Sequence, residues 1–356
     1  MFKKLFIVSA GAIILSGCSA NVPQSTTVTK GSIWKSFDSG ATFVPKVTVD
    51  ETQRITSSDV LSFVFDPKDS QVIYLGTKAN GIFKTTDGAE HWEAMKFPPL
   101  KVYGLAIDHA DSSKIYASGV YNNVAKLYRL DSEENMWKEI YTEPGEGAVI
   151  TALGSSPDAS GVLYVGMSTG VVLKSMDGGA TWKNIFVAKG PVTKILFHKE
   201  APKMVTLLVF NKNVMVSWDE GETWNDQTTL ERLSTRVSTN VATVEPQAMT
   251  TIALDPVKTN VIFGGAQNGL FRSEDNGKKW QALKIIESSK KFPARAIAIN
   301  PHNANEITYV AGKVLYRSLD GGIRWSTVEL PVDRGVSVIE YDPLHPEIMY
   351  FALRKF

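Results

Sequence analysis

The sequence predicts an all-β protein, a single seven-bladed β-propeller of four-stranded antiparallel blades whose ring is closed by N-terminal strands. Three observations predict it. An octapeptide recurs about every 45 residues, two short β-rich segments precede most copies, and the partial units at the two ends of the chain complement each other. A period of this length is typical of propellers and solenoids.

The repeated octapeptide begins with Ser or Thr, has Asp at its third position and ends in an aromatic residue. Six copies cover residues 36–43, 85–92, 175–182, 217–224, 273–280 and 318–325, and a degenerate seventh covers 129–137. The closing aromatic residues are 49, 45, 45, 42, 56 and 45 residues apart. This spacing predicts one supersecondary unit per period.

The residue types of the octapeptide fit a hairpin turn. The Asp side chain can accept hydrogen bonds from backbone amides, Gly supplies a positive φ, and the aromatic residue buries its surface between sheets. Metal binding or acid–base catalysis would be the functional alternatives, but near-identical sites spread around an array suit neither. We predict structural roles for Asp38, Asp87, Asp131, Asp177, Asp219, Asp275, Asp320, Trp92, Trp137, Trp182, Trp224, Trp280 and Trp325.

Each complete unit is predicted to be a four-stranded meander. The unit is plainest from residue 60 onward, where VLSFVFDP, VIYLGT, GIFKTTD and HWEAMKF alternate with turn residues. Six further copies of the first two strands are LAIDH with IYASG, LGSSP with LYVGM, ILFHK with VTLLVF, IALDP with VIFGG, IAINP with ITYVAG, and IEYDP with IMYFAL.

The two ends of the chain predict how the ring closes. The last strand pair reaches Phe356 with no octapeptide after it, while the segment from Gly31 to Phe43 holds an octapeptide hairpin with no strand pair before it. Joining them completes a seventh blade and removes exposed sheet edges. An open β-solenoid is the alternative.

The first residues predict an export signal. Lys3 and Lys4 precede the largely apolar residues 5–15, and the sequence from Leu15 to Cys18 resembles the bacterial lipobox, whose cysteine is diacylated. A transmembrane anchor is the alternative, but the apolar run is short for a bilayer. We predict a signal peptide at 1–17, lipidated Cys18 with a flexible tether at 18–31, and the propeller at 32–356. The expected location is the bacterial cell envelope, at the outer membrane or the outer leaflet of the cell membrane.

The charge balance narrows the expected partners. The chain has 38 Lys and Arg against 37 Asp and Glu, and loss of Lys3 and Lys4 with the signal leaves 36 against 37. Such a nearly neutral protein is not expected to bind nucleic acid. The five histidines lie in turns of different units, so no metal site and no cofactor are expected. We expect a monomeric domain that meets the membrane through its lipid and binds a protein, peptide or glycan.

The S/T-x-D-x-G-x-x-W pattern resembles the Asp-box, or BNR, repeat from about Ser32 to the end of the chain. The resemblance implies a propeller and leaves function open, since sialidases, xyloglucanases, the sortilin luminal domain and photosystem II assembly factors share it. It also implies that the octapeptide turns lie at the periphery, away from the mouth of the channel. The assembly factors have the most similar overall layout and are associated with an arginine-rich patch.

Interblade loops are therefore where we expect a site. Several arginines fall in these connections, and we predict that they bind the partner: Arg54, Arg232, Arg236, Arg295 and Arg334. A basic rim would suit an acidic peptide, a carboxylate or a polyanionic glycan. Acidic residues in the same loops leave open the alternative of ordinary solvated charges. The long segment 225–249 fits either a short amphipathic helix or a disordered insertion.

Two classes of function remain from the sequence. A non-catalytic, membrane-anchored binding or assembly scaffold is the first, with no catalytic residues. The alternative is a glycoside hydrolase of sialidase or xyloglucanase type. Xyloglucanases resembling this chain carry a catalytic Asp in a stretch where this chain has Gly76-Thr77-Lys78-Ala79-Asn80-Gly81, and the paired carboxylates that hydrolysis needs are not visible.

Overall fold

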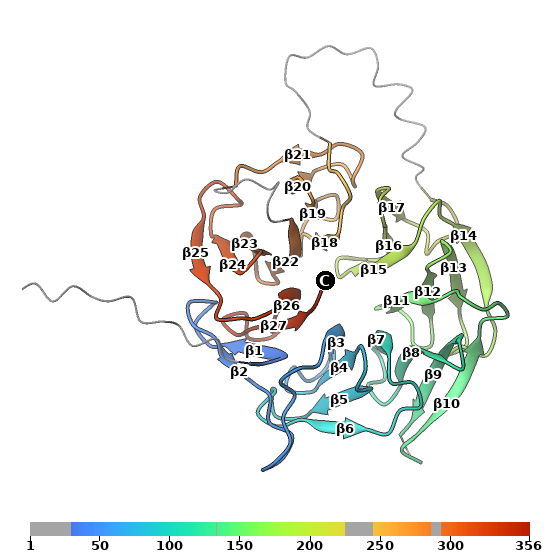
Figure 1. Cartoon of the computed structure of the whole chain (residues 1–356). Coiled ribbons are helices and arrows are strands. Elements are labelled where there is room, and N and C mark those ends of the chain that lie inside the picture. The colour runs from blue at the N-terminus through green and yellow to red at the C-terminus, as the bar shows by residue number, and fades with distance from the viewer. Residues whose placement is uncertain (1–29, 133, 225–244, 286–292) are drawn as a thin grey trace, which may run out of the picture.

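The computed structural model describes residues 30–132, 134–224, 245–285 and 293–356. In these residues seven antiparallel sheets surround one axis and follow each other in chain order, which confirms the predicted seven-bladed β-propeller (Figure 1). We number the blades 1 to 7 from the first complete one. The described residues contain no helix of the length and apolarity needed to cross a bilayer.

The first three blades are four-stranded meanders. Blade 1 comprises β3 (Val60–Phe65), β4 (Ile73–Thr77), β5 (Ile82–Thr85) and β6 (Glu93–Met95). Blade 2 comprises β7 (Val102–Ile107), β8 (Ile115–Tyr121), β9 (Val124–Asp131) and β10 (Met136–Thr142). Blade 3 comprises β11 (Ile150–Ser155), β12 (Leu163–Met167), β13 (Val171–Ser175) and β14 (Lys183–Val187).

The next three blades repeat this order. Blade 4 comprises β15 (Val192–His198), β16 (Ala201–Val209) and β17 (Val214–Ser217) within the described residues. Blade 5 comprises β18 (Thr251–Leu254), β19 (Ile262–Ala266), β20 (Gly269–Ser273) and β21 (Gln281–Ala282). Blade 6 comprises β22 (Ala294–Asn300), β23 (Asn303–Ala311), β24 (Val314–Ser318) and β25 (Ser326–Glu329). Most of the segment 225–249, with its two predicted alternatives, lies outside the described residues.

Blade 7 is built from both ends of the chain, as predicted. Its strands are β26 (Gly335–Tyr341), β27 (Met349–Arg354), β1 (Ile33–Ser36) and β2 (Val44–Pro45). β1 pairs antiparallel with β27, with Ile33 opposite Ala352 and Ser36 opposite Met349. The buried Trp34 stacks on Phe351 with ring centroids 5.8 Å apart. The ring is therefore closed by backbone pairing and by aromatic packing.

The octapeptide forms the turn between the third and fourth strands of a blade. In the copy 175–182, the Ser175 hydroxyl donates to Asp177 Oδ1 over 2.8 Å and accepts from the Gly179 N–H over 2.8 Å. Asp177 Oδ1 also accepts from the Thr181 N–H over 2.8 Å. Gly179 has a φ of +91°, where a side chain would be strained. The same three bonds recur in the copies that begin at Ser36, Thr85, Ser217, Ser273 and Ser318.

The degenerate copy in blade 2 has a different geometry. There β9 continues to Asp131 and β10 begins at Met136. The paired part of this hairpin is therefore longer than in the other blades. Lys138 Nζ lies 2.7 Å from Asp131 Oδ2, and Asp131 Oδ1 accepts from the Glu134 N–H over 3.3 Å. An ion pair across the strands thus stabilises this turn.

Neighbouring blades are joined by apolar clusters and by the closing tryptophans. The junction of blades 7 and 1 buries Ile33 and Tyr350 against Ile73 and Leu75. Trp92 packs in the same cluster and donates its indole N–H to the Lys46 carbonyl over 2.9 Å. In blade 6, the Trp325 indole N–H donates to the Lys284 carbonyl of blade 5 over 3.0 Å. Each of these blades therefore buries apolar surface against its neighbour.

We predict that neutralising one turn carboxylate lowers stability at neutral pH. Hydrogen bonds, first from the Thr181 hydroxyl and then from the Thr181 N–H and Ser175, hold the pKa of Asp177 at about 2, below its usual 3.8. A lowered pKa in the folded state stabilises the fold above about pH 4 and loses that contribution as the pH falls toward about 2. The melting temperature of Asp177→Asn should therefore be lower than that of the wild type at neutral pH.

Thermal denaturation across this acidic range checks the prediction. The difference in melting temperature between Asp177→Asn and the wild type should shrink as the pH falls, because protonation removes the same charge from the wild type. A difference that stays constant down to about pH 2 would contradict it.

Candidate binding site at the mouth of the ring

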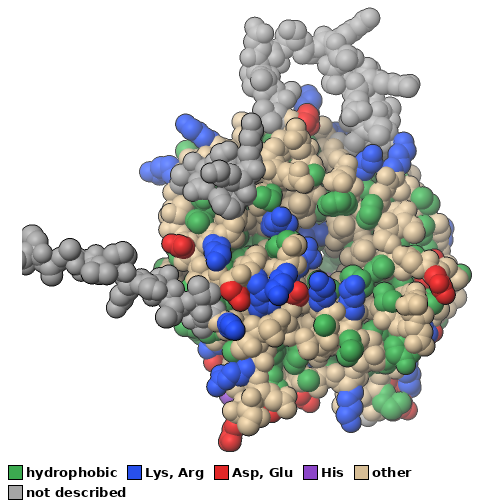
Figure 2. Space-filling view, in the orientation of Figure 1, with side chains coloured by type: hydrophobic (Ala, Val, Ile, Leu, Met, Phe, Trp, Pro, Cys, Tyr) green, Lys and Arg blue, Asp and Glu red, His purple; other side chains and the backbone are tan. Residues whose placement is uncertain are grey.

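The innermost strands all begin on one side of the ring, which we call the mouth face. Strand direction alternates within a meander, so the turns between the second and third strands lie on this face too, and the octapeptide turns lie on the opposite one. This is the side on which the interblade loops were expected to gather. Viewed along the axis, the C-terminus lies near the centre of the ring (Figure 1). Lys and Arg side chains gather around the same centre (Figure 2).

A bulge at the start of most innermost strands presents one side chain to the next blade. The Thr151 hydroxyl donates to the Val192 carbonyl over 2.5 Å, and the Ser337 hydroxyl donates to the Val60 carbonyl over 3.1 Å. Register shifts mark both places. Blade 6 has the same register shift, but there the displaced residue is Arg295. The fold thus places a long cation where blades 3, 4 and 7 carry the short hydroxyls of Thr151, Thr193 and Ser337.

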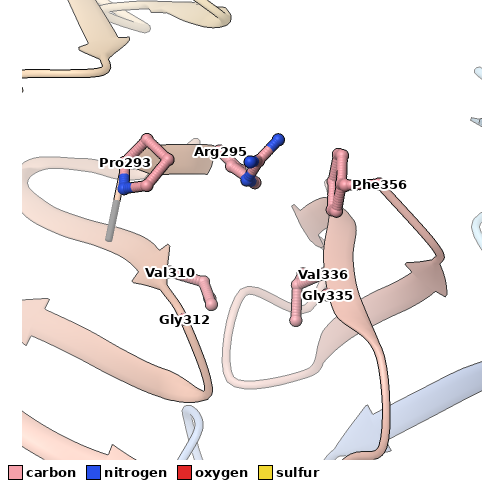
Figure 3. Close-up of a pocket in the computed structure, with 7 residues that line it drawn as sticks. All are labelled: Pro293, Arg295, Val310, Gly312, Gly335, Val336 and Phe356. Carbon is pink, nitrogen blue, oxygen red and sulfur yellow. The ribbon is translucent and has the colours of Figure 1, made fainter. Parts of the chain in front are cut away.

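Arg295 lines a cavity of about 150 Å³ between blades 6 and 7 (Figure 3). Phe356 forms the facing wall, and the guanidinium carbon of Arg295 lies 4.0 Å from the centroid of its ring. The guanidinium carbon of Arg354, at the end of β27, lies 4.4 Å from the same centroid. Two cations and one aromatic ring therefore meet at the mouth, in cation–π geometry. We call Arg295, Arg354 and Phe356 the arginine–phenylalanine cluster.

The electrostatics of this cluster favour an anion. Within the described residues, neither guanidinium forms an ion pair, and Arg354 Nε is buried without a hydrogen-bond partner. Burial lowers the pKa of Arg295. The pKa of Arg354 is lowered first by burial and then by the charge of Arg295, against the opposing effect of Asp59. A carboxylate between them would supply the missing acceptors and offset the repulsion.

The structure places Arg334 in a setting different from the exposed rim that was expected. Its guanidinium is buried and donates to the carbonyls of Gly31, Thr56 and Ser58 over 2.8, 3.0 and 3.0 Å. It also pairs with Asp59 at 3.2 Å. These contacts join the start of the chain, the loop before β3 and the start of β26, so Arg334 serves ring closure and has no donor free for a partner.

The other predicted arginines are not brought into the cluster. Arg54 is exposed in the loop between β2 and β3, where its backbone forms an isolated β-bridge with Thr48. The Thr48 carbonyl accepts a hydrogen bond from the backbone N–H of Trp92. It therefore lies near the outer wall of blades 7 and 1. Arg232 and Arg236 lie outside the described residues. Of the predicted set, Arg295 is the member found at the cavity.

Sequence reasoning missed Arg354 and Phe356. Arg354 pairs with Gly335, one position before the register shift that begins at Val336. The equivalent residue of blade 1 is Lys78, which follows Thr77, the partner of Val60 at the same register shift. A cation at this position is therefore not peculiar to blade 7, and the repeat pattern does not single out Arg354.

Comparisons with known proteins are consistent with the propeller and give no family. No family model matches the chain. Xyloglucanase Xgh74A of Acetivibrio thermocellus is 26% identical over 182 residues, which cover 43% of this chain and 21% of that enzyme. The chain thus aligns with about a fifth of its curated relative.

Solved structures of similar fold come from two kinds of protein. The xyloglucanase of Xanthomonas campestris has a TM-score of 0.65 at 16% identity, over 83% of this chain and 51% of that one. YCF48 of Cyanidioschyzon merolae has a TM-score of 0.62 at 13% identity, over 83% and 96%. A structure of YCF48 bound to D1 peptide has a TM-score of 0.63 at 15% identity, over 87% and 98%. At these identities the likeness shows the fold alone.

We predict that Arg334→Ala lowers the free energy of unfolding and leaves the cavity between blades 6 and 7 unchanged. The substitution removes the cation that pairs with Asp59 and the donor to the carbonyls of Gly31, Thr56 and Ser58. Removal of one partner of a buried ion pair typically costs about 3–5 kcal/mol. Chemical denaturation measures the loss. Arg324→Ala is the matched control, because Arg324 is exposed and pairs only within its own turn. Equal stability of the two variants would contradict the role assigned to Arg334.

Proposed function

We propose that this protein is a non-catalytic, membrane-anchored binding or assembly scaffold of the cell envelope that recognises an acidic segment of a protein or peptide at its mouth face. The observation that carries the proposal is the arginine–phenylalanine cluster, in which Arg295 and Arg354 flank Phe356 without an acidic partner among the described residues. We also assign the octapeptide to the Asp-box type, on its sequence pattern and its turn geometry.

The chemistry of the cluster defines the ligand. Guanidinium groups bind carboxylates through two parallel hydrogen bonds, and a half-enclosed site strengthens such pairs relative to bulk water. The exposed Phe356 ring adds an apolar surface beside the charges. A peptide that presents Asp or Glu next to an apolar side chain fits both features. An acidic glycan shares the carboxylate but has less apolar surface for the ring.

Comparison with YCF48 supports a peptide as the ligand. A propeller of similar fold is described as bound to D1 peptide, and this chain covers 98% of it. The resemblance noted from the sequence, to lipid-anchored or exported assembly factors with an arginine-rich patch, points the same way.

Glycan hydrolysis is the alternative, favoured by the xyloglucanase relatives. Retaining and inverting glycosidases generally need two carboxyl groups flanking one bond. The described residues that line the central channel include one carboxylate, Glu340. The turn aspartates accept hydrogen bonds on the opposite face, as at Asp177. These observations favour binding over hydrolysis.

We propose that Cys18 carries the lipid and that residues 19–31 form the tether. Gly31 lies beside Arg334 at the mouth face. A chain of 13 residues from Cys18 to Gly31 spans at most about 45 Å when extended. The anchor would therefore keep the mouth face close to the bilayer surface, within reach of segments that emerge from membrane proteins.

We predict that the double variant Arg295→Ala, Arg354→Ala weakens binding of an acidic peptide by at least about tenfold. A fluorescent peptide rich in Glu and Phe is a suitable probe, read by anisotropy. Wild-type affinity should fall as salt is added, because charge pairs at a half-exposed site are screened. The matched control is Arg54→Ala, which removes the same charge from an exposed loop and should leave affinity unchanged.

The double variant should keep the wild-type melting temperature to within a few degrees. Equal affinity of the double variant and the wild type, with both folded, would contradict the proposed site. Turnover of xyloglucan by the purified protein, lost in Glu340→Gln, would instead establish the hydrolase.

We predict that Cys18→Ser moves the protein out of the membrane fraction. Without the thiol no diacylglyceryl group can be attached, and the mature chain loses its proposed anchor. Fractionation of cells followed by immunoblotting checks the distribution, and mass spectrometry of the wild type checks the lipid. A variant that stays in the membrane fraction to the same extent as the wild type would refute the anchor.

A further inference from the structure

A second cavity lies on the axis of the ring. Its volume is about 240 Å³, and the innermost strands of all seven blades contribute to its lining. Many of the lining side chains are aliphatic, and others carry hydroxyls, as at Thr193 and Ser337. Among the described residues of this lining, Lys194 and Glu340 alone carry a charge. The cavity therefore holds one cation and one anion in an otherwise neutral wall.

These two side chains come from opposite parts of the ring. Lys194 lies on β15 of blade 4 and Glu340 on β26 of blade 7, three blades apart in a ring of seven. They form no ion pair within 4.0 Å, and neither makes a hydrogen bond with another described residue. The buried Lys174, by contrast, pairs with Glu220 at 3.1 Å. The two charges of the axial cavity thus act on each other electrostatically without direct contact.

Both charged side chains can be reached from the axial cavity. Glu340 is exposed to the cavity and Lys194 is half-buried, so each is accessible to a small molecule. Burial lowers the pKa of Lys194, and the charge of Glu340 partly offsets this. Burial raises the pKa of Glu340, and Lys194 opposes that shift in turn. Partners of opposite charge in the cavity would stabilise the ionised form of both.

We propose that the axial cavity binds a small zwitterion, a molecule that carries one carboxylate and one ammonium group, such as a free amino acid. The carboxylate pairs with Lys194 and the ammonium group with Glu340, while hydroxyls and backbone groups of the lining contact the remainder. An anion alone would be repelled by Glu340, and a cation alone by Lys194. A neutral molecule with both charges is the one class that complements the whole cavity.

Calorimetry on the full chain, dialysed free of small molecules, tests this assignment. The probes are glycine, β-alanine, γ-aminobutyrate and 5-aminovalerate, which separate the two charges by increasing lengths. Acetate and methylammonium carry one charge each and serve as controls. At least one zwitterion should bind about tenfold more tightly than either control. Failure of every zwitterion to bind more tightly than acetate and methylammonium would overturn the proposal.

Variants of the two charged residues localise the binding. Glu340→Gln and Lys194→Met should each weaken zwitterion binding by about tenfold or more. Glu340→Gln keeps the shape of the side chain, so it remains informative if Lys194→Met does not fold. Arg324→Ala is the control, because Arg324 is exposed in an octapeptide turn on the opposite face, and it should leave zwitterion affinity unchanged. Full affinity in Glu340→Gln would place the ligand elsewhere and overturn the assignment, whatever the result for acidic peptides at the mouth.

Discussion

The pairing of β1 with β27 is the interaction on which the whole ring depends. Every other blade is made from one continuous stretch of chain, but blade 7 joins residues more than 300 positions apart, from Ile33 to Ala352. Without it, both edges of an open array would expose unpaired backbone groups, and two interblade apolar faces would lose their cover. Trp34 on Phe351 and the guanidinium of Arg334 reinforce the same joint.

Most of the fold follows from the sequence because it is specified locally. The turn at Asp177 needs a hydroxyl, a carboxylate and a left-handed glycine within a few residues, and these can be recognised in any copy. Counting the copies and matching the incomplete units at the two ends of the chain then gives seven blades. Even the exception in blade 2 is local, since Lys138 pairs with Asp131 across the same hairpin.

The candidate site follows from the sequence only in part, because it is specified by distant segments. Arg295 was identified from its place in an interblade connection. Its companion Arg354 ends a strand, and the two meet only because blade 7 closes beside blade 6. Arg334 looks equally available in the sequence, yet its acceptors Ser58 and Gly31 are 276 and 303 residues away. A near-zero net charge likewise gives no sign of two guanidinium groups that form no ion pair within the described residues.

The position of Gly31 has a mechanical consequence. A load applied through the preceding chain enters at the N-terminal end of β1, where Gly31 is held by the guanidinium of Arg334. When β1 is pulled along its own direction, it must slide past both β27 and β2. The backbone hydrogen bonds on its two sides are then loaded in shear, so they share the force instead of breaking one at a time. The strand that completes the ring is thus also well oriented to bear tension between the domain and whatever holds it.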